Sequence, residues 1–223
     1  MWMQRSSQLS YKPLFNYTKP ACNKVYLFLK WILMKIIKPI IDFIMDILET
    51  VVFIGSMFIV VYLFILTPNQ IKGASMENTF HTGDYILTSR VTYKFRRLER
   101  GDVIVFKSPK NPDIEYIKRI IGLPGDIINI SDEGIVKVND IQLSENYIAA
   151  TTNLWEGGCI KDKIPYKVED GYIFVMGDNR PRSSDSREFC AVKIDSIIGD
   201  VFYRYFPSSV MGVISNPLPK SIR

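Results

Sequence analysis

Twenty-two consecutive uncharged residues, 50–71, constrain this chain more than any other feature of its sequence. As a helix rising about 1.5 Å per residue, such a segment would cross a hydrocarbon core about 30 Å thick. Its central part, 51–66, is apolar apart from Gly55, Ser56 and Tyr62. Because a long polar and basic arm precedes it, we expect a retained transmembrane helix rather than a cleaved signal peptide.

Positive charge is concentrated before this segment. Residues 1–50 carry seven basic and three acidic side chains, a balance of +4 in a chain whose net charge is +5. The near-neutral remainder lacks the basic face of a nucleic-acid binder, so we expect no nucleic acid partner. Four lysines lie between residues 24 and 38, whereas only Lys72 follows the segment closely. The positive-inside rule therefore predicts a cytoplasmic arm at 1–49, a single transmembrane helix at 50–71 and an outer domain at 72–223.

A second apolar stretch, residues 25–48, precedes the uncharged segment. Its charged side chains recur at spacings of three and four residues and draw one polar stripe along a helix. The stripe consists of Lys35, Lys38, Asp42, Asp46 and Glu49. This pattern favours a helix in the lipid headgroup layer, with a second, weaker membrane span as the alternative.

Short runs rich in β-branched and aromatic residues follow the uncharged segment. The predicted strands are 85–91, 102–106, 114–121, 126–130, 135–138, 172–176 and 196–205. Ser-Asp-Glu-Gly at 131–134 predicts a hairpin turn, and Leu-Pro-Gly-Asp at 123–126 predicts a type II turn. The expected fold class is mostly β, with one transmembrane helix at its N-terminal side.

The chain has three cysteines, Cys22, Cys159 and Cys190, and one histidine, His81. No two cysteines form a CxxC pair and one histidine cannot build a His-rich site, so we expect no metal and no cofactor. Cys159 and Cys190 both follow the uncharged segment, where an oxidising compartment would allow a disulfide. Two buried thiols are an equally good alternative.

Two residues could be catalytic: Ser75, in the loop after the uncharged segment, and Lys118, in the predicted strand 114–121. Ser75 follows the uncharged segment by four residues, so an extended chain keeps it within about 10–15 Å of the membrane surface. Strand alternation places Lys118 on one face with Ile114, Tyr116 and Ile120. Apolar surroundings lower the pKa of a lysine, which prepares it to act as a general base. An ordinary polar loop and a lysine that reaches water are the alternatives.

A dense polar loop, GDNRPRSSDSRE at 177–188, directly follows the predicted strand 172–176. It lacks the alternating acidic ligands and the central glycine of a calcium-binding EF-hand. We expect a wall of hydrogen-bonded ion pairs in which Ser183 or Ser186 is available to hold a neutral amine. The expected ion pairs are Asp185 with Arg187 and Asp178 with Arg180.

Four blocks of sequence occur in the order seen in one known family: GASM around Ser75, RGDVIVF at 100–106, YIKRIIGLPGD at 116–126 and GDNRPRSSDSRE at 177–188. With the apolar segment, they make residues from about 51 to about 206 similar to the type I signal peptidases. The resemblance implies Ser75 as the nucleophile, Lys118 as the general base and a serine acyl-enzyme. It also implies Ser183 as the hydroxyl that orients the lysine amine, with Asp185 and Arg187 in support.

The same resemblance implies a coiled, mainly antiparallel β-sheet with shallow pockets for the small side chains of an Ala-X-Ala-like cleavage site. The implied pocket residues are Ile71, Met76, Phe80, Tyr116 and Ile117. The backbone of 116–118 would pair with the extended substrate, and an apolar surface beside the site would rest on membrane lipid. The expected substrates are signal-bearing preproteins, cleaved by a monomer on the outer side of a bacterial cytoplasmic membrane.

Three positions depart from the family pattern. Gly73 stands where some members have a serine that donates a second hydrogen bond to the oxyanion. Asn78 replaces a usual proline, and the Pro181-Arg182 pair is uncommon. None of these changes removes Ser75 or Lys118.

Other functions use similar residues. A Ser-His-Asp hydrolase would need His81, which lies six residues after Ser75 beside a turn and is expected on the surface. Self-cleaving repressors also use a serine and a lysine, but they need a DNA-binding domain where this chain has an apolar segment. The retained Ser75 and Lys118 argue against a catalytically silent, anchored binding module.

Overall fold

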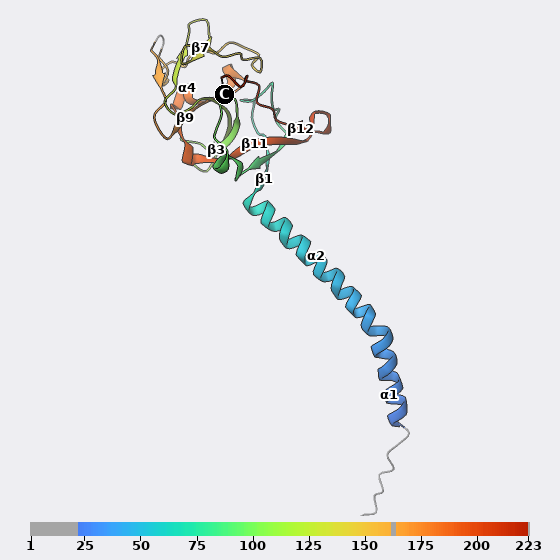
Figure 1. Ribbon diagram of the computed structural model, residues 1–223. Coiled ribbons are helices and arrows are strands. Elements are labelled where there is room, and N and C mark those ends of the chain that lie inside the picture. The colour runs from blue at the N-terminus through green and yellow to red at the C-terminus, as the bar shows by residue number, and fades with distance from the viewer. Residues whose placement is uncertain (1–21, 162–163, 223) are drawn as a thin grey trace, which may run out of the picture. The chain divides into compact units, whose positions relative to one another are not determined.

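The computed structural model describes residues 22–161 and 164–222, and the chain divides into two compact units with the boundary between Met57 and Phe58. The described chain begins with helical elements that follow one another without a break (Figure 1). They are α1 (Cys22–Ile32), the π-helical η1 (Leu33–Ile37) and α2 (Lys38–Phe64).

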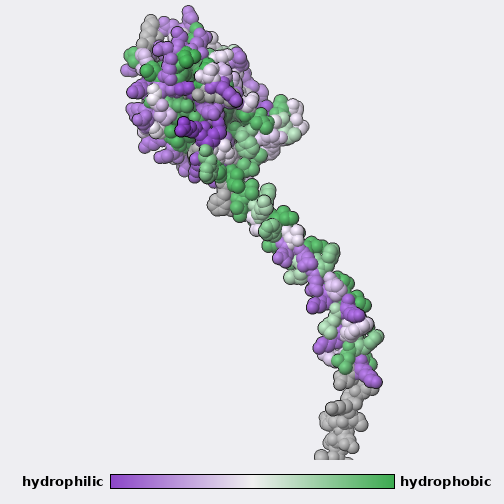
Figure 2. Space-filling view, in the orientation of Figure 1, coloured by the Kyte–Doolittle hydropathy of each residue, from purple (hydrophilic) through white to green (hydrophobic). Residues whose placement is uncertain are grey.

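One helix in the described part of the chain, Lys24–Tyr62, is long and apolar enough to cross a membrane. Hydrophobic side chains are exposed along the whole helix, and charged side chains interrupt them only as far as Glu49 (Figure 2). Residues 25–48 were predicted to form a helix separate from the next segment. That separation is wrong, because η1 and α2 continue the helix through residue 48.

The helix predicted at 50–71 ends earlier than expected. α2 ends at Phe64, and β1 (Leu66–Gln70) is a strand that pairs antiparallel with β2 (Tyr85–Ser89). Pro68 explains the difference, because proline lacks the N–H that a helix interior requires and disfavours helical backbone in the residue before it. The last part of the uncharged segment therefore belongs to a β-sheet.

The other elements are short. The strands are β3 (Val103–Lys107), β4 (Glu115–Gly122), β5 (Ile127–Ile130), β6 (Val136–Val138), β7 (Ile141–Gln142), β8 (Tyr166–Lys167), β9 (Tyr172–Met176), β10 (Val192–Lys193), β11 (Ile197–Phe206) and β12 (Gly212–Val213). The helical turns are α3 (Thr92–Phe95), η2 (Arg180–Arg182), α4 (Ser186–Phe189), η3 (Ile194–Ser196) and η4 (Ser208–Val210). All seven predicted strands are present, and each end lies within two residues of its predicted position.

The strands form two antiparallel sheets, which confirms the mostly β fold class. The larger sheet has the order β1-β2-β11-β3-β4-β9-β10, with β12 paired to β11. It curls into a half-barrel, visible around the β3 and β11 labels in Figure 1. The smaller sheet has the order β7-β6-β5-β8. Residues 131–134 join β5 to β6 as the predicted hairpin turn.

β4 is paired unequally along its two edges. Residues 115–119 pair with β3, but pairing with β9 begins only at Arg119. Within the described part of the chain, the β9-side edge of residues 115–118 therefore has no partner strand. An extended peptide could add to this edge, because it leaves backbone N–H and C=O groups available.

Phe106→Ala should strongly destabilise the fold, because Phe106 is 0% exposed and packs against Ile104, Ile120 and Tyr116. The resulting cavity should lower the free energy of unfolding by about 3–5 kcal/mol. Phe95→Ala is the matched control, because Phe95 is 88% exposed and its loss should change stability by less than about 0.5 kcal/mol. Urea unfolding of the full chain in detergent measures both, and equal effects would contradict this packing.

Candidate active site

Ser75 lies in the turn that joins β1 to β2. Two buried side chains, Met76 and Phe80, anchor this turn in an apolar cluster with Ile71. The Phe80 N–H donates to the Met76 carbonyl at 2.8 Å. The Ser75 carbonyl accepts from the Asn179 N–H at 3.0 Å. The half-buried serine is thus fixed by its own turn and by the polar loop at 177–188.

Lys118 lies on β4 and is 3% exposed. Its Nζ donates to Ser75 Oγ at 2.8 Å and to the Ile117 carbonyl at 2.9 Å. The same nitrogen lies 5.1 Å from the centre of the Tyr116 ring. Two residues that are 43 positions apart in the sequence are therefore in direct contact.

Burial lowers the pKa of Lys118 from its ordinary value of 10.5 to about 8, because loss of water disfavours the ammonium. The carboxylates of Asp185 and Asp178 oppose this shift, and the Arg187 guanidinium adds to it. At pH 7 a lysine with this pKa holds about a tenth of its amine neutral, about 300 times more than an ordinary lysine. The amine can therefore accept a hydroxyl proton near neutral pH.

Ser183 is fully buried near this pair. Its Oγ has no hydrogen-bond partner among the residues that the structure describes, so the expected bond to the lysine amine is not formed here. A Cβ added at Gly177 would come within 2.2 Å of Ser183 Oγ and 2.4 Å of the Ser75 carbonyl oxygen. Only glycine at position 177 lets the polar loop approach the serine this closely.

Asp185 and Arg187 form the predicted ion pair, and both side chains are fully buried. Arg187 Nη2 lies 2.8 Å from Asp185 Oδ2, and Nε donates to Oδ1 at 2.8 Å. Asp185 Oδ2 also accepts from the Gly177 N–H at 3.0 Å. Arg187 donates further to the carbonyls of Arg180 and Ser183. This pair therefore connects the beginning of the polar loop to its end.

The second predicted ion pair, Asp178 with Arg180, is wrong. Asp178 pairs with Arg119 at 2.6 Å, and Arg180 pairs with Glu145. The cause is sheet pairing, since β4 and β9 are neighbours and bring Arg119 next to the residues that end β9. Sequence reasoning missed both partners because no local pattern reports which strands are adjacent. The Tyr147 ring, 4.4 Å from the Arg119 guanidinium, was missed for the same reason.

A groove of about 560 Å³ lies between the chain at residues 68–72 and the chain at residues 113–117. One wall includes part of β1 and the other includes the beginning of β4, where the edge toward β9 is unpaired. The first wall leads to the turn of Ser75, and the second leads directly to Lys118. The groove is therefore placed to guide an extended chain toward the two residues.

Three of the five predicted pocket residues line this groove: Ile71, Tyr116 and Ile117. The other two, Met76 and Phe80, are buried in the cluster that contains Ile71 and is packed by Ile117. Met76 and Phe80 thus support the groove and do not line it.

Asn78 and His81 occupy the rest of the turn region. Asn78 has a φ of +94°, which is closed to proline because its ring fixes φ near −65°. A proline could therefore not take the place of Asn78 without a change in the backbone of this turn. Asn78 Nδ2 also donates to the Tyr147 carbonyl at 3.4 Å. His81 is exposed, as expected for a surface loop residue.

Comparison with known proteins identifies the family. Residues 44–206 match the family described as Signal peptidase, peptidase S26. The chain belongs to this family. It is a signal peptidase of type I, a class of serine peptidases.

Two relatives and one solved structure illustrate the similarity to signal peptidases. Signal peptidase IB of Staphylococcus aureus is 34% identical in strain COL and 33% identical in strain MRSA252, and each alignment covers 77% of this chain and 96% of the relative. A crystal structure of a signal peptidase I from Enterococcus faecalis V583 is 36% identical. It covers 47% of this chain and 97% of its own, with a TM-score of 0.39.

Asp178→Asn should destabilise the fold, because Arg119 would keep its charge in a buried site without a carboxylate. Breaking one side of a buried ion pair costs about 3–5 kcal/mol. Glu188→Gln is the control, because Glu188 pairs with Lys110 at the surface and its loss should cost less than about 1 kcal/mol. Thermal unfolding of the full chain compares them, and an unchanged Tm for Asp178→Asn would contradict the assigned pairing.

Proposed function

We propose that this chain is a membrane-bound endopeptidase that cleaves signal peptides from exported preproteins, with Ser75 as the nucleophile and Lys118 as the general base. The observation that carries the proposal is the 2.8 Å contact between Lys118 Nζ and Ser75 Oγ, made by a lysine that is 3% exposed. A lysine in water would stay charged near pH 7 and could not accept the proton. Membership of the signal peptidase family supports the substrate class.

The reaction follows from the positions of the two side chains. Ser75 Oγ attacks the scissile carbonyl carbon while Lys118 Nζ takes the hydroxyl proton. That proton passes to the leaving amine when the C–N bond breaks, and the signal peptide stays on Ser75 as an ester. Lys118 then takes a proton from water, whose oxygen attacks the ester carbonyl carbon. The C–Oγ bond breaks, Lys118 returns the proton to Ser75 Oγ, and the signal peptide leaves with a free carboxyl group. The Ser75 N–H donates to the oxyanion, and Gly73 has no side chain to add a second donor.

Ser183 is assigned to orient the Lys118 amine during these steps. A buried hydroxyl without a hydrogen-bond partner is unfavourable, and a bond to the neutral amine would remove that cost. Asp185 and Arg187 are assigned to hold the loop that carries Ser183, which their bonds to Gly177 and to the Ser183 carbonyl support.

The groove beside Ser75 is the proposed binding site for the segment that precedes the cleavage point. The unpaired edge of residues 116–118 would add the substrate as a further strand, since its backbone groups face the groove side of β4 without a partner strand in the described chain. Ile71 and Ile117 would leave room only for small side chains, consistent with an Ala-X-Ala-like site. Met76 and Phe80 act from beneath by fixing the turn of Ser75.

The apolar helix at 24–62, which is long enough to cross a membrane, supports the proposed membrane attachment. The charge bias at its two ends favours an N-terminus in the cytoplasm and a catalytic domain on the outer side of a bacterial cytoplasmic membrane. An active site on that side would reach preproteins while their signal peptides are still held in the lipid. We assign the working unit as a monomer in contact with membrane lipid, without a nucleic acid partner.

Ser75→Ala and Lys118→Ala should each lower cleavage of an Ala-X-Ala precursor by at least about 10³-fold while the proteins stay folded. Lys118→Arg should be equally inactive, because arginine stays charged. The measurement uses the purified full chain in detergent micelles, with His81→Ala as the control that keeps activity.

Three other outcomes would contradict the assigned dyad or the proposed function. Activity retained by Lys118→Ala would place the base elsewhere, and loss of serine acylation in His81→Ala would revive a Ser-His-Asp triad. A folded wild-type protein that cleaves no precursor would favour an anchored binding module.

A further inference from the structure

The segment at 153–159 holds Arg187 from two sides. Arg187 Nη1 donates to the Asn153 carbonyl at 2.8 Å and to Asn153 Oδ1 at 3.0 Å. The Arg187 carbonyl accepts from the Cys159 N–H at 2.8 Å. A Cβ added at Gly158 would come within 2.4 Å of that carbonyl oxygen, so the contact requires glycine there. This segment therefore fixes both the side chain and the backbone of Arg187.

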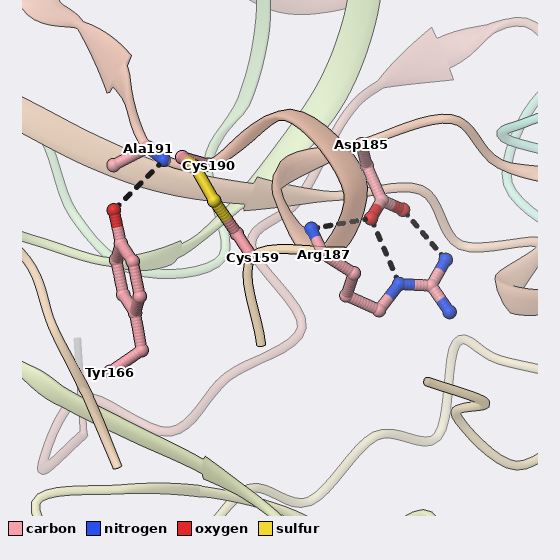
Figure 3. The surroundings of a disulfide bond; sticks show 6 residues. All are labelled: Cys159, Tyr166, Asp185, Arg187, Cys190 and Ala191. Carbon is pink, nitrogen blue, oxygen red and sulfur yellow. Dashed lines mark hydrogen bonds and ion pairs between the residues drawn. A yellow bond between two sulfur atoms is a disulfide. The ribbon is translucent and has the colours of Figure 1, made fainter. Parts of the chain in front are cut away.

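A disulfide between Cys159 and Cys190 adds a covalent bond beside these hydrogen bonds (Figure 3). Cys190 directly follows α4, the helical turn that carries Arg187, and its N–H donates to the Ser186 carbonyl at 3.1 Å. Figure 3 shows the disulfide beside the Asp185–Arg187 pair, with the Ala191 N–H donating to the Tyr166 hydroxyl next to it. The covalent link thus joins the segment at 153–159 to the polar loop of the active site.

The backbone of Cys190 shows that a cysteine is an unusual choice at this position. Its φ of 72° and ψ of −174° lie in a region that only glycine adopts without strain. A strained residue persists where the surrounding structure over-determines it. Here a glycine would satisfy the backbone but would remove the sulfur, so the strained position points to a use for the disulfide.

We propose that the Cys159–Cys190 disulfide is a positioning element for the proposed reaction: it keeps Arg187, and through it Asp185 and the Ser183 segment, in place beside Lys118. The inference rests on the proposed function of Ser75 and Lys118. It assigns Cys159 and Cys190 no contact with substrate.

The effect would pass from the disulfide through Arg187 to Asp185 and Ser183. Arg187 binds both carboxylate oxygens of Asp185, and Asp185 binds the Gly177 N–H, so displacing Arg187 loosens the loop at both ends. The same guanidinium donates to the Ser183 carbonyl. A looser loop would admit water to Lys118, whose lowered pKa depends first on burial. More of the lysine would then be protonated near neutral pH.

The test compares oxidised wild type, Cys159→Ser and Cys190→Gly, each as the full chain in detergent micelles. Cys190→Gly is the sharper variant, because glycine adopts the backbone at 190 without strain and the change removes only the CH2–S group that forms the disulfide. We expect kcat for precursor cleavage to fall about 10- to 100-fold, KM to stay within about twofold because the groove is not touched, and the acidic limb of the pH–kcat profile to move to higher pH. A merely structural disulfide would change stability and leave that limb in place.

Reduction provides a second measurement on protein that has already folded. Two-electron reduction by dithiothreitol converts the disulfide to two thiols and the reagent to its cyclic disulfide, and it should lower wild-type kcat as the variants do. A Cys22→Ser background removes the third thiol. If Cys190→Gly does not fold, the reduced Cys22→Ser protein supplies the same comparison.

The outcomes distinguish the positioning role of the disulfide from the proposed function of Ser75 and Lys118. Wild-type kcat and an unmoved acidic limb in folded Cys190→Gly, or an equal loss of activity when dithiothreitol is added to Cys190→Gly, would overturn the positioning role alone. An oxidised wild type that cleaves nothing would overturn the proposed function, and the positioning role with it.

Discussion

The burial of the Lys118 amine against the Ser75 hydroxyl is the interaction on which the rest of this structure depends. A lysine in a dry site loses its proton more easily, but nearby carboxylates would return it by stabilising the ammonium. Asp185 and Asp178 are the carboxylates that act in this direction. Each is paired with a buried arginine, Arg187 and Arg119 respectively, and the loss of water outweighs the effect of both carboxylates on Lys118. The pKa of Lys118 can therefore fall although acidic residues surround it.

The buried arginines also explain how a small β domain builds a polar site. Arg119, Arg180 and Arg187 are among the largest fully buried side chains, and each binds a carboxylate and at least one backbone carbonyl. Burying such pairs brings little net stability, but breaking one is costly. We interpret this network as a device for specificity: it fixes one arrangement of the loop at 177–188 relative to β4. The positions of Ser75, Lys118 and Ser183 relative to one another depend on that arrangement.

The sequence predicts the parts of this fold that local patterns control. Runs of β-branched and aromatic residues locate seven of the eight strands that are longer than two residues, β1 being the exception, and strand alternation places Lys118 on an apolar face. The early end of α2 was also readable, since Pro68 stands inside the predicted helix. The contact between Ser75 and Lys118 came from resemblance to a family, because alternation cannot say which loop a buried lysine meets.

Long-range pairing controls what the sequence left open. The two-residue strands β7, β8, β10 and β12 exist only because of their partners, and no periodicity can reveal them. The partners of Asp178 and Arg180 depend on strand adjacency and on the segment after β7 in the same way. The disulfide between Cys159 and Cys190 joins residues 31 positions apart, and spacing alone allowed either a bond or two thiols.

The most direct test of this account is an NMR titration of the Lys118 side chain in the full chain in micelles, with Lys118→Met used to assign its signal. Because burial disfavours the charged form, the amine should lose its proton with a midpoint near pH 8 and be neutral above it. A midpoint near the ordinary 10.5 would mean that the amine stays charged at neutral pH. Lys118 could then not serve as the base for Ser75, and the central claim would fail.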